Sequence, residues 1–202
     1  MGTSRVVALC AVMSACGHVG SAAHSKEPSP TLRSATGDTA TLAALTASHD
    51  ATVLVFWSSG CPCVRRYQAR VDALAERFSA RGVQVLAVSS NAGENYDEAL
   101  SIARERGVKV PLWRDEGGAV AGLVGARSTP TAAVLDRTGA LRFIGWVDNE
   151  REPGAEDREP WLEQAIEGVL TPGPFTKRTP TWGCTITRSL SPIEPRHCVA
   201  AQ

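Results

Sequence analysis

The chain has no surplus of charge of either sign and no long apolar run. Its 202 residues carry 21 Lys and Arg against 21 Asp and Glu, so it lacks the cationic field with which proteins usually hold nucleic acid. No stretch approaches the roughly 20 apolar residues that a spanning helix needs, which excludes a polytopic membrane protein. Aromatic residues are only 5% of the chain, yet 43% is hydrophobic, which suffices for a core and excludes a disordered chain. The length fits one domain of roughly 100–200 residues with extensions.

The first 25 residues have the pattern of an export signal. Arg5 precedes an apolar run over residues 6–15, and small residues follow to position 23. Two cleavage interpretations compete. Ordinary signal peptidase would cut after residue 23, whereas the Met-Ser-Ala-Cys segment at 13–16 resembles a bacterial lipobox that would lipidate Cys16. Either route exports the chain to the periplasm or cell envelope, where disulfides persist. A lipid anchor would be its only contact with the membrane.

Polar ends frame a central region of alternating strands and helices. Residues 24–37 are rich in Pro and Ser and predict a tether, and residues 172–202 carry five prolines and predict an irregular tail. For residues 38–171, hydrophobic periodicity predicts helices at 39–48, 63–81, 94–106, 118–125 and 159–170, and strands at 51–57, 83–90, 110–113, 131–136 and 141–147. Because strands joined by helices pair in parallel and the late hairpin adds an antiparallel edge, the fold class is α/β. We expect a mixed sheet flanked by helices on both faces.

Cys61-Pro62-Cys63 is the segment that carries chemistry. Cysteine attacks as the thiolate, and the free N–H groups and positive dipole end at a helix start lower the pKa of a thiol. Both cysteines stand at the start of a predicted helix, where Pro62 suits the first turn. Arg65 is four residues after Cys61 and Arg66 three after Cys63, so each thiol has a cation within helical reach to stabilise the thiolate. The pattern predicts thiol–disulfide exchange. A structural disulfide, buried free thiols or a metal-binding pair are the alternatives.

Two segments of the chain resemble the thioredoxin-like fold. They are residues 56–67 (FWSSGCPCVRRY) and, about 60 residues later, residues 128–131 (STPT). Within that fold, the chain is similar to the redoxin branch related to alkyl hydroperoxide reductase and thiol-specific antioxidant proteins, over about residues 38–187. Some members of that branch carry a Cys-Pro and a Tyr at the helix start and Gly-Cys-x-Ile in a tail, matched here by Cys61, Pro62, Tyr67, Gly183, Cys184 and Ile186.

The resemblance implies the layout of a substrate groove. It implies that Pro130 is cis beside the reactive cysteine and that the Thr129 backbone presents an edge to an extended substrate, with Trp57 at the same groove. Two features depart from the thioredoxin pattern. A single residue separates the two thiols, and Val55 stands six residues before Cys61, where thioredoxins carry a buried acid.

We therefore expect an exported thiol–disulfide oxidoreductase in which Cys61 is the nucleophile and Cys63 is either the resolving thiol or a neighbour that modulates it. Its partners would be protein thiols or disulfides, or a small thiol or peroxide, and no cofactor or metal is implied. Two alternatives on the same fold are a thiol peroxidase of the redoxin type and a copper-binding or copper-delivery protein. The peroxidase is disfavoured because the strand before Cys61 lacks the Pro of a typical peroxiredoxin motif.

Cys184 has two possible roles. In one, it pairs with Cys198 and closes a tail loop of about 15 residues, a staple worth about 3 kcal/mol in the entropy model. In the other, the apolar segment around it docks on the domain and Cys184 resolves a sulfenate or mixed disulfide on Cys61. Gly183 allows the close backbone turn that docking needs. Proximity in sequence favours the staple, although Cys198 stands near a terminus that tends to fray.

Overall fold

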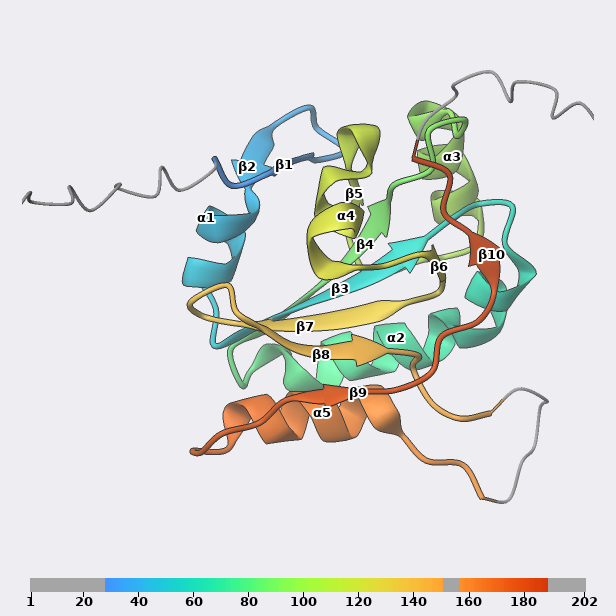
Figure 1. The fold of residues 1–202 in the computed structure, drawn as a ribbon. Helices are drawn as coiled ribbons and strands as arrows, with labels where there is room; N and C mark the ends of the chain where they lie inside the picture. Colours follow the sequence, from blue (N-terminus) through green and yellow to red (C-terminus); the bar gives the residue numbers. More distant parts are fainter. Residues whose placement is uncertain (1–27, 151–156, 189–202) are drawn as a thin grey trace, which may run out of the picture.

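The computed structural model describes residues 28–150 and 157–188 (Figure 1). The helices are α1 (Leu42–Ala47), α2 (Pro62–Ser79), α3 (Tyr96–Glu105), the 3-10 turn η1 (Glu116–Gly118), α4 (Ala119–Val124) and α5 (Trp161–Leu170). The strands are β1 (Thr31–Arg33), β2 (Thr39–Thr41), β3 (Ala51–Trp57), β4 (Val83–Ser89), β5 (Leu112–Arg114), β6 (Ser128–Thr129), β7 (Ala132–Asp136), β8 (Leu141–Gly145), β9 (Lys177–Arg178) and β10 (Cys184–Thr185). Each predicted helix and strand has a counterpart, with shifts of a few residues at the ends. The helix predicted at 39–48 is wrong over its first three residues, which form strand β2 against β1.

One mixed sheet organises the described chain. Its strand order is β2-β1-β5-β4-β3-β7-β8-β9, and β6 and β10 form a separate two-stranded sheet. The central strands β3, β4 and β5 pair in parallel, whereas β7 joins β3 antiparallel and β8 joins β7 antiparallel. β3 is buried along its whole length because helices cover both of its faces, which explains its unbroken β-branched and aromatic sequence. The predicted α/β class is confirmed.

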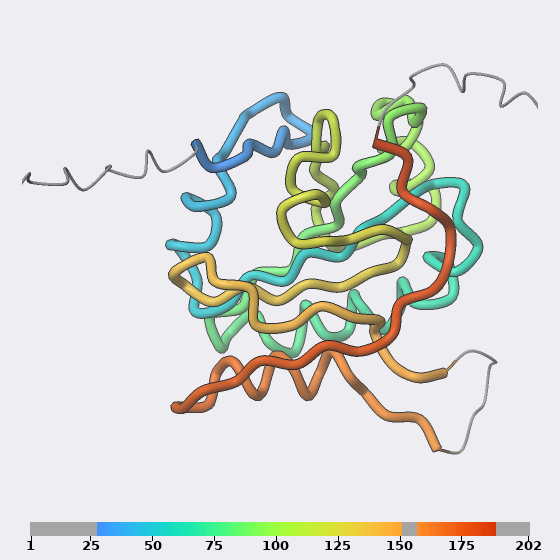
Figure 2. The backbone as a smooth tube through the Cα atoms, in the orientation of Figure 1, coloured from blue at the N-terminus to red at the C-terminus, as the bar shows by residue number. Residues whose placement is uncertain are grey.

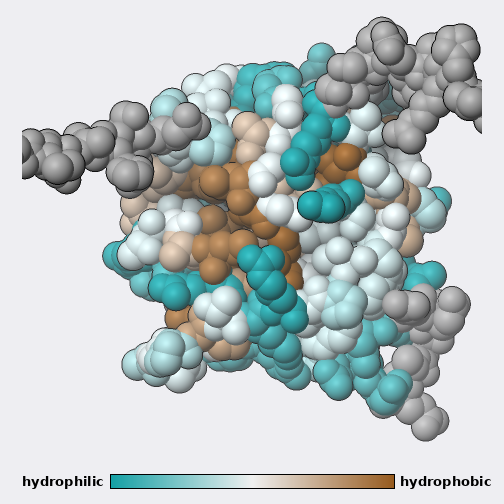
Figure 3. Space-filling view, viewed as in Figure 1, coloured by the Kyte–Doolittle hydropathy of each residue, from teal (hydrophilic) through white to brown (hydrophobic). Residues whose placement is uncertain are grey.

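The two faces of the sheet hold two hydrophobic clusters. Alternate residues of β3 point to opposite sides, so Val55 belongs to the cluster under α2, α3 and α5, and Phe56 to the cluster under α1 and α4. Figure 3 shows apolar side chains gathered around and between α1 and α4 on the face in view. The first cluster extends to Cys61, so the start of α2 is fixed to a rigid core.

Both predicted ends of the domain need correction. Residues 24–37 are not a tether throughout, because Thr31–Arg33 form β1, which pairs with β2 and β5 and buries Leu32. The tail after residue 172 is not irregular throughout either. β9 adds a parallel strand to β8, and β10 pairs with β6. Figure 2 shows this last segment, in red, running past the edge of the sheet at which α2 begins. The signal and lipobox residues, Cys16 included, lie outside the described residues.

In the part of the chain that the structure describes, no helix has the length and apolar character to cross a membrane.

Candidate active site

The start of α2 places Cys61 at a helix N-terminus. Cys61 is the N-cap residue, with extended backbone angles, and Pro62 occupies the first turn as predicted. The free N–H groups of the first turn therefore lie next to the Cys61 thiol. This side chain is only 1% exposed, so burial and the helix end act on the same sulfur.

The second wall of the site is the loop before β7. The Thr129–Pro130 peptide bond is cis, as the resemblance implies. The Cys61 Sγ–H donates to the Thr129 carbonyl oxygen over 3.2 Å. This loop and the start of α2 therefore meet at Cys61, and β6, which contains Thr129, forms the edge expected to hold a substrate.

That edge is occupied by the chain's own C-terminal segment. β10 pairs antiparallel with β6, with Cys184 opposite Thr129 (Figure 1). Gly183, at φ +122, lies against the Thr129 carbonyl, and a Cβ added there would stand 2.1 Å from that oxygen. Only glycine permits this approach, because any side chain would collide with backbone. The groove predicted to receive a substrate holds Cys184 instead.

Contacts on both sides of Cys184 fix the segment. The Trp182 ring lies 3.7 Å from that of Trp146, centroid to centroid. Ile186 is buried and its N–H donates to the Arg127 carbonyl over 2.9 Å. Arg188 donates to the carbonyl of Ala121 in α4 over 3.3 Å and to that of Ala126 over 2.7 Å. Cys184 is therefore held at the site by its neighbours.

Neutral donors set the pKa of Cys61. Burial of the thiol acts to raise the pKa, but hydrogen bonds from the Cys184 thiol, the Thr129 hydroxyl and the N–H groups of Val64 and Cys184 outweigh it and lower the pKa. The pKa of Cys184 moves the other way. Burial raises it, and the hydrogen bond and charge of Cys61 raise it further, to about 12. Of the two thiols, Cys61 therefore ionises more readily and Cys184 holds its proton more firmly.

The predicted roles of the two arginines need revision. Arg65 is exposed, and the largest effects on the Cys61 pKa come from burial, Cys184, Thr129 and Val64. It lines a cavity of about 300 Å³ with Trp57 and Gln68. The charge of Arg66 acts to lower the pKa of Cys63, as expected. Burial and the nearby Cys61 have larger effects in the other direction, so the net pKa of Cys63 is raised.

Trp57 lies behind the site and not in the groove. It is 1% exposed, and its Nε1–H donates to Gln68 Oε1 over 3.2 Å. Gln68 in turn donates to Asp72, which also accepts the N–H groups of Lys109 and Val110. This network ties β3, α2 and the segment before β5 together beneath Cys61.

Glu94 is a site residue that the sequence analysis missed. Its carboxylate accepts from Ser58 Oγ (3.1 Å), from Ser59 N and Oγ (2.7 and 2.8 Å) and from Ser89 Oγ (2.6 Å). It thereby joins the loop that leads to Cys61 to the end of β4. The periodicity placed Glu94 at the start of a helix, and no local signal pointed to serines 35 residues away along the chain.

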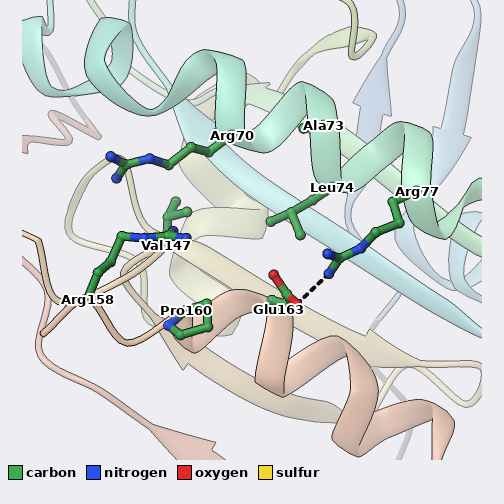
Figure 4. Close-up of a pocket in the computed structure, with 8 residues that line it drawn as sticks. All are labelled: Arg70, Ala73, Leu74, Arg77, Val147, Arg158, Pro160 and Glu163. Carbon is green, nitrogen blue, oxygen red and sulfur yellow. Dashed lines mark ion pairs between the residues drawn. The ribbon is translucent and has the colours of Figure 1, made fainter. Parts of the chain in front are cut away.

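A separate cavity of about 190 Å³ lies between α2 and α5 and contains no cysteine (Figure 4). Three arginines line it, but their charges are balanced. Arg70 pairs with Asp148 and Glu150, Arg158 pairs with Asp148, and Arg77 pairs with Glu163 at 2.7 Å. This cavity is therefore lined by balanced ion pairs between two helices.

The described residues contain three thiols and no candidate metal cage. Cys61, Cys63 and Cys184 are all unbridged, and no group of three or more His, Cys, Asp or Glu side chains within residues 28–150 and 157–188 is arranged to hold a metal ion. Cys198, the other candidate partner of Cys184, lies outside the described residues.

The chain belongs to the AhpC/TSA family, whose model matches residues 23–144. Family membership supports an oxidoreductase activity and confirms the predicted redoxin resemblance. A search of curated proteins finds no match.

Solved structures share the fold. A hypothetical protein from Sinorhizobium meliloti is 25% identical with a TM-score of 0.69, over 81% of this chain and 95% of that one. An uncharacterized conserved protein from Geobacillus kaustophilus is 27% identical, also with a TM-score of 0.69, over 82% and 92%. A proposed thiol:disulfide interchange protein DsbE from Chlorobium tepidum is 24% identical with a TM-score of 0.57, over 71% and 94%. The fold is thioredoxin-like.

The geometry predicts that the pKa of the Cys61 thiol is lower than that of a free cysteine. It also predicts that the hydrogen bond from the Cys184 thiol contributes to this lowering. The ultraviolet absorbance of the thiolate, followed against pH in the Cys63→Ser protein, should show an inflection below that of a free cysteine. Removing the thiol donor with Cys184→Ala should move the inflection upward. An inflection at the free-thiol value, unchanged by Cys184→Ala, would contradict the proposed hydrogen bonding.

Proposed function

We propose that the protein is an exported thiol–disulfide oxidoreductase whose redox pair is Cys61 and Cys184. The observation that carries the proposal is the antiparallel register that sets Cys184 opposite Thr129, with its thiol hydrogen-bonded to Cys61. Cys61 is the nucleophilic thiolate, and Cys184 is the thiol that forms the disulfide with it. Protein thiols or disulfides are the substrates.

The other site residues support this pair. Pro130 and Thr129 form the wall against which the Cys61 sulfur lies, and Glu94 holds the loop that leads to Cys61. Cys63 is a neighbouring thiol whose raised pKa makes it a weaker nucleophile than Cys61 at neutral pH. Arg66 lowers the cost of a charge at Cys63. This arrangement avoids a Cys61–Cys63 bridge, which would close over a single intervening proline.

The expected oxidised form contains a Cys61–Cys184 disulfide, found by non-reducing peptide mapping. Cys61→Ser should reduce disulfide exchange with a model protein such as insulin to the rate without enzyme. Cys184→Ser should slow turnover strongly, whereas Cys63→Ser should retain most of it. The exchange rate should fall as the pH drops through the lowered pKa of Cys61, because protonation removes the thiolate. A Cys184–Cys198 bridge beside a Cys61–Cys63 bridge would overturn the assignment.

We also propose export and lipidation at Cys16, on the strength of the N-terminal sequence. The lipobox-like segment at 13–16 follows an apolar run, and the cysteine pair proposed above needs a compartment that permits disulfides. Mass spectrometry of membrane-extracted protein from a bacterial host should find a diacylglyceryl group on an N-terminal Cys16. A soluble mature form that starts at His24 would support ordinary secretion instead.

A further inference from the structure

Access to the two sulfurs of the proposed pair is unequal. Cys61 is 1% exposed, because the start of α2, the Thr129–Pro130 loop and β10 enclose it. Cys184 is half-buried, and its neighbours Gly183 and Thr185 are exposed. A molecule that approaches from solvent therefore reaches Cys184 before Cys61.

We infer that Cys184 is the interchange cysteine of this protein: a partner thiol attacks the Cys184 sulfur, and Cys61 is an internal leaving group that the partner does not touch. This inference rests on the proposed Cys61–Cys184 disulfide. It reverses the order expected from the sequence, in which the helix-start cysteine meets the substrate, because the edge that would receive a substrate already holds β10.

The proposed exchange proceeds by two successive thiol–disulfide displacements. A partner thiolate forms a bond to Cys184 Sγ, the Cys61–Cys184 bond breaks, and its electron pair leaves with Cys61 as thiolate. A second partner thiolate then attacks the partner's own sulfur in the mixed disulfide and releases Cys184, which takes a proton from water. The partner dithiol becomes a disulfide, and the Cys61–Cys184 pair is reduced.

Leaving-group chemistry favours the same order. Exchange is faster when the displaced thiol has a lower pKa, and it depends on which sulfur is accessible. Attack at Cys184 expels Cys61, whose thiolate accepts hydrogen bonds from Thr129 and from the N–H of Val64. Attack at Cys61 would expel Cys184, whose pKa is raised. Both access and leaving-group stability therefore direct the partner to Cys184.

The experiment determines which of the two cysteines forms the mixed disulfide with an external thiol. The Cys63→Ser chain is oxidised, and peptide mapping first establishes the Cys61–Cys184 link. Reduced glutathione is then added in excess, and the reaction is stopped with acid at short times. The expected early product carries glutathione on Cys184 with Cys61 as a free thiol, in about tenfold or greater excess over the reverse adduct. Glutathione found mainly on Cys61 would overturn this inference alone, whereas failure of the Cys61–Cys184 link to form would remove the proposed redox pair.

Two glycines of the C-terminal segment provide a matched comparison. Gly183→Ala places a Cβ 2.1 Å from the Thr129 carbonyl and should displace β10, whereas Gly173→Ala, at a similar φ of +129, meets no atom within 4 Å. In the reduced protein, at an alkaline pH at which Cys61 is ionised in both variants, alkylation of Cys61 should be about tenfold faster in Gly183→Ala than in the Gly173→Ala control. Equal rates in both variants, with Cys61 alkylated as fast as Cys184, would show that β10 does not cover Cys61 and would overturn the inference.

Discussion

The pairing of β10 with β6 is the contact on which the site depends. It brings a segment from near the C-terminal end of the described chain to the loop before β7, and the fit requires the absence of a side chain at Gly183. Without it, Cys61 would be a thiol at an open helix start. With it, Cys61 is enclosed, gains a thiol donor and has a second cysteine within bonding reach.

This enclosure explains how a buried thiol keeps a lowered pKa. Burial alone penalises the thiolate, and among the described residues the largest effects that offset this penalty at Cys61 come from neutral donors. Hydrogen bonds from a hydroxyl, a thiol and two backbone N–H groups replace the lost water instead. Val55, in the place where thioredoxins carry a buried acid, is part of the apolar core beneath. The chemistry of the site is therefore built from neutral groups whose positions the sheet and α2 fix.

The order of the elements follows from the sequence, because long periodic segments determine it. Three segments carry a strong local signal: the apolar run at 51–57, the apolar face of α2, and the Cys-Pro at the start of α2. β1, β9 and β10 carry none, since they have two or three residues and form only against a partner strand. The thiolate-stabilising role expected of Arg65 finds no support in the contacts described for Cys61, for a related reason. Helical spacing places a side chain within reach but does not say which way it points, and here Arg65 faces another cavity.

The most direct test of the docked segment measures the Ile186 amide, which donates to the Arg127 carbonyl beside the β6–β10 pair. Amide hydrogen exchange followed by NMR in the reduced protein should show Ile186 protected well above the rate of an unstructured peptide. The protection should be lost in Gly183→Ala and kept in Gly173→Ala. Exchange of Ile186 at the unstructured rate in the unmodified protein would contradict the account, because β10 would then not hold Cys184 against Cys61.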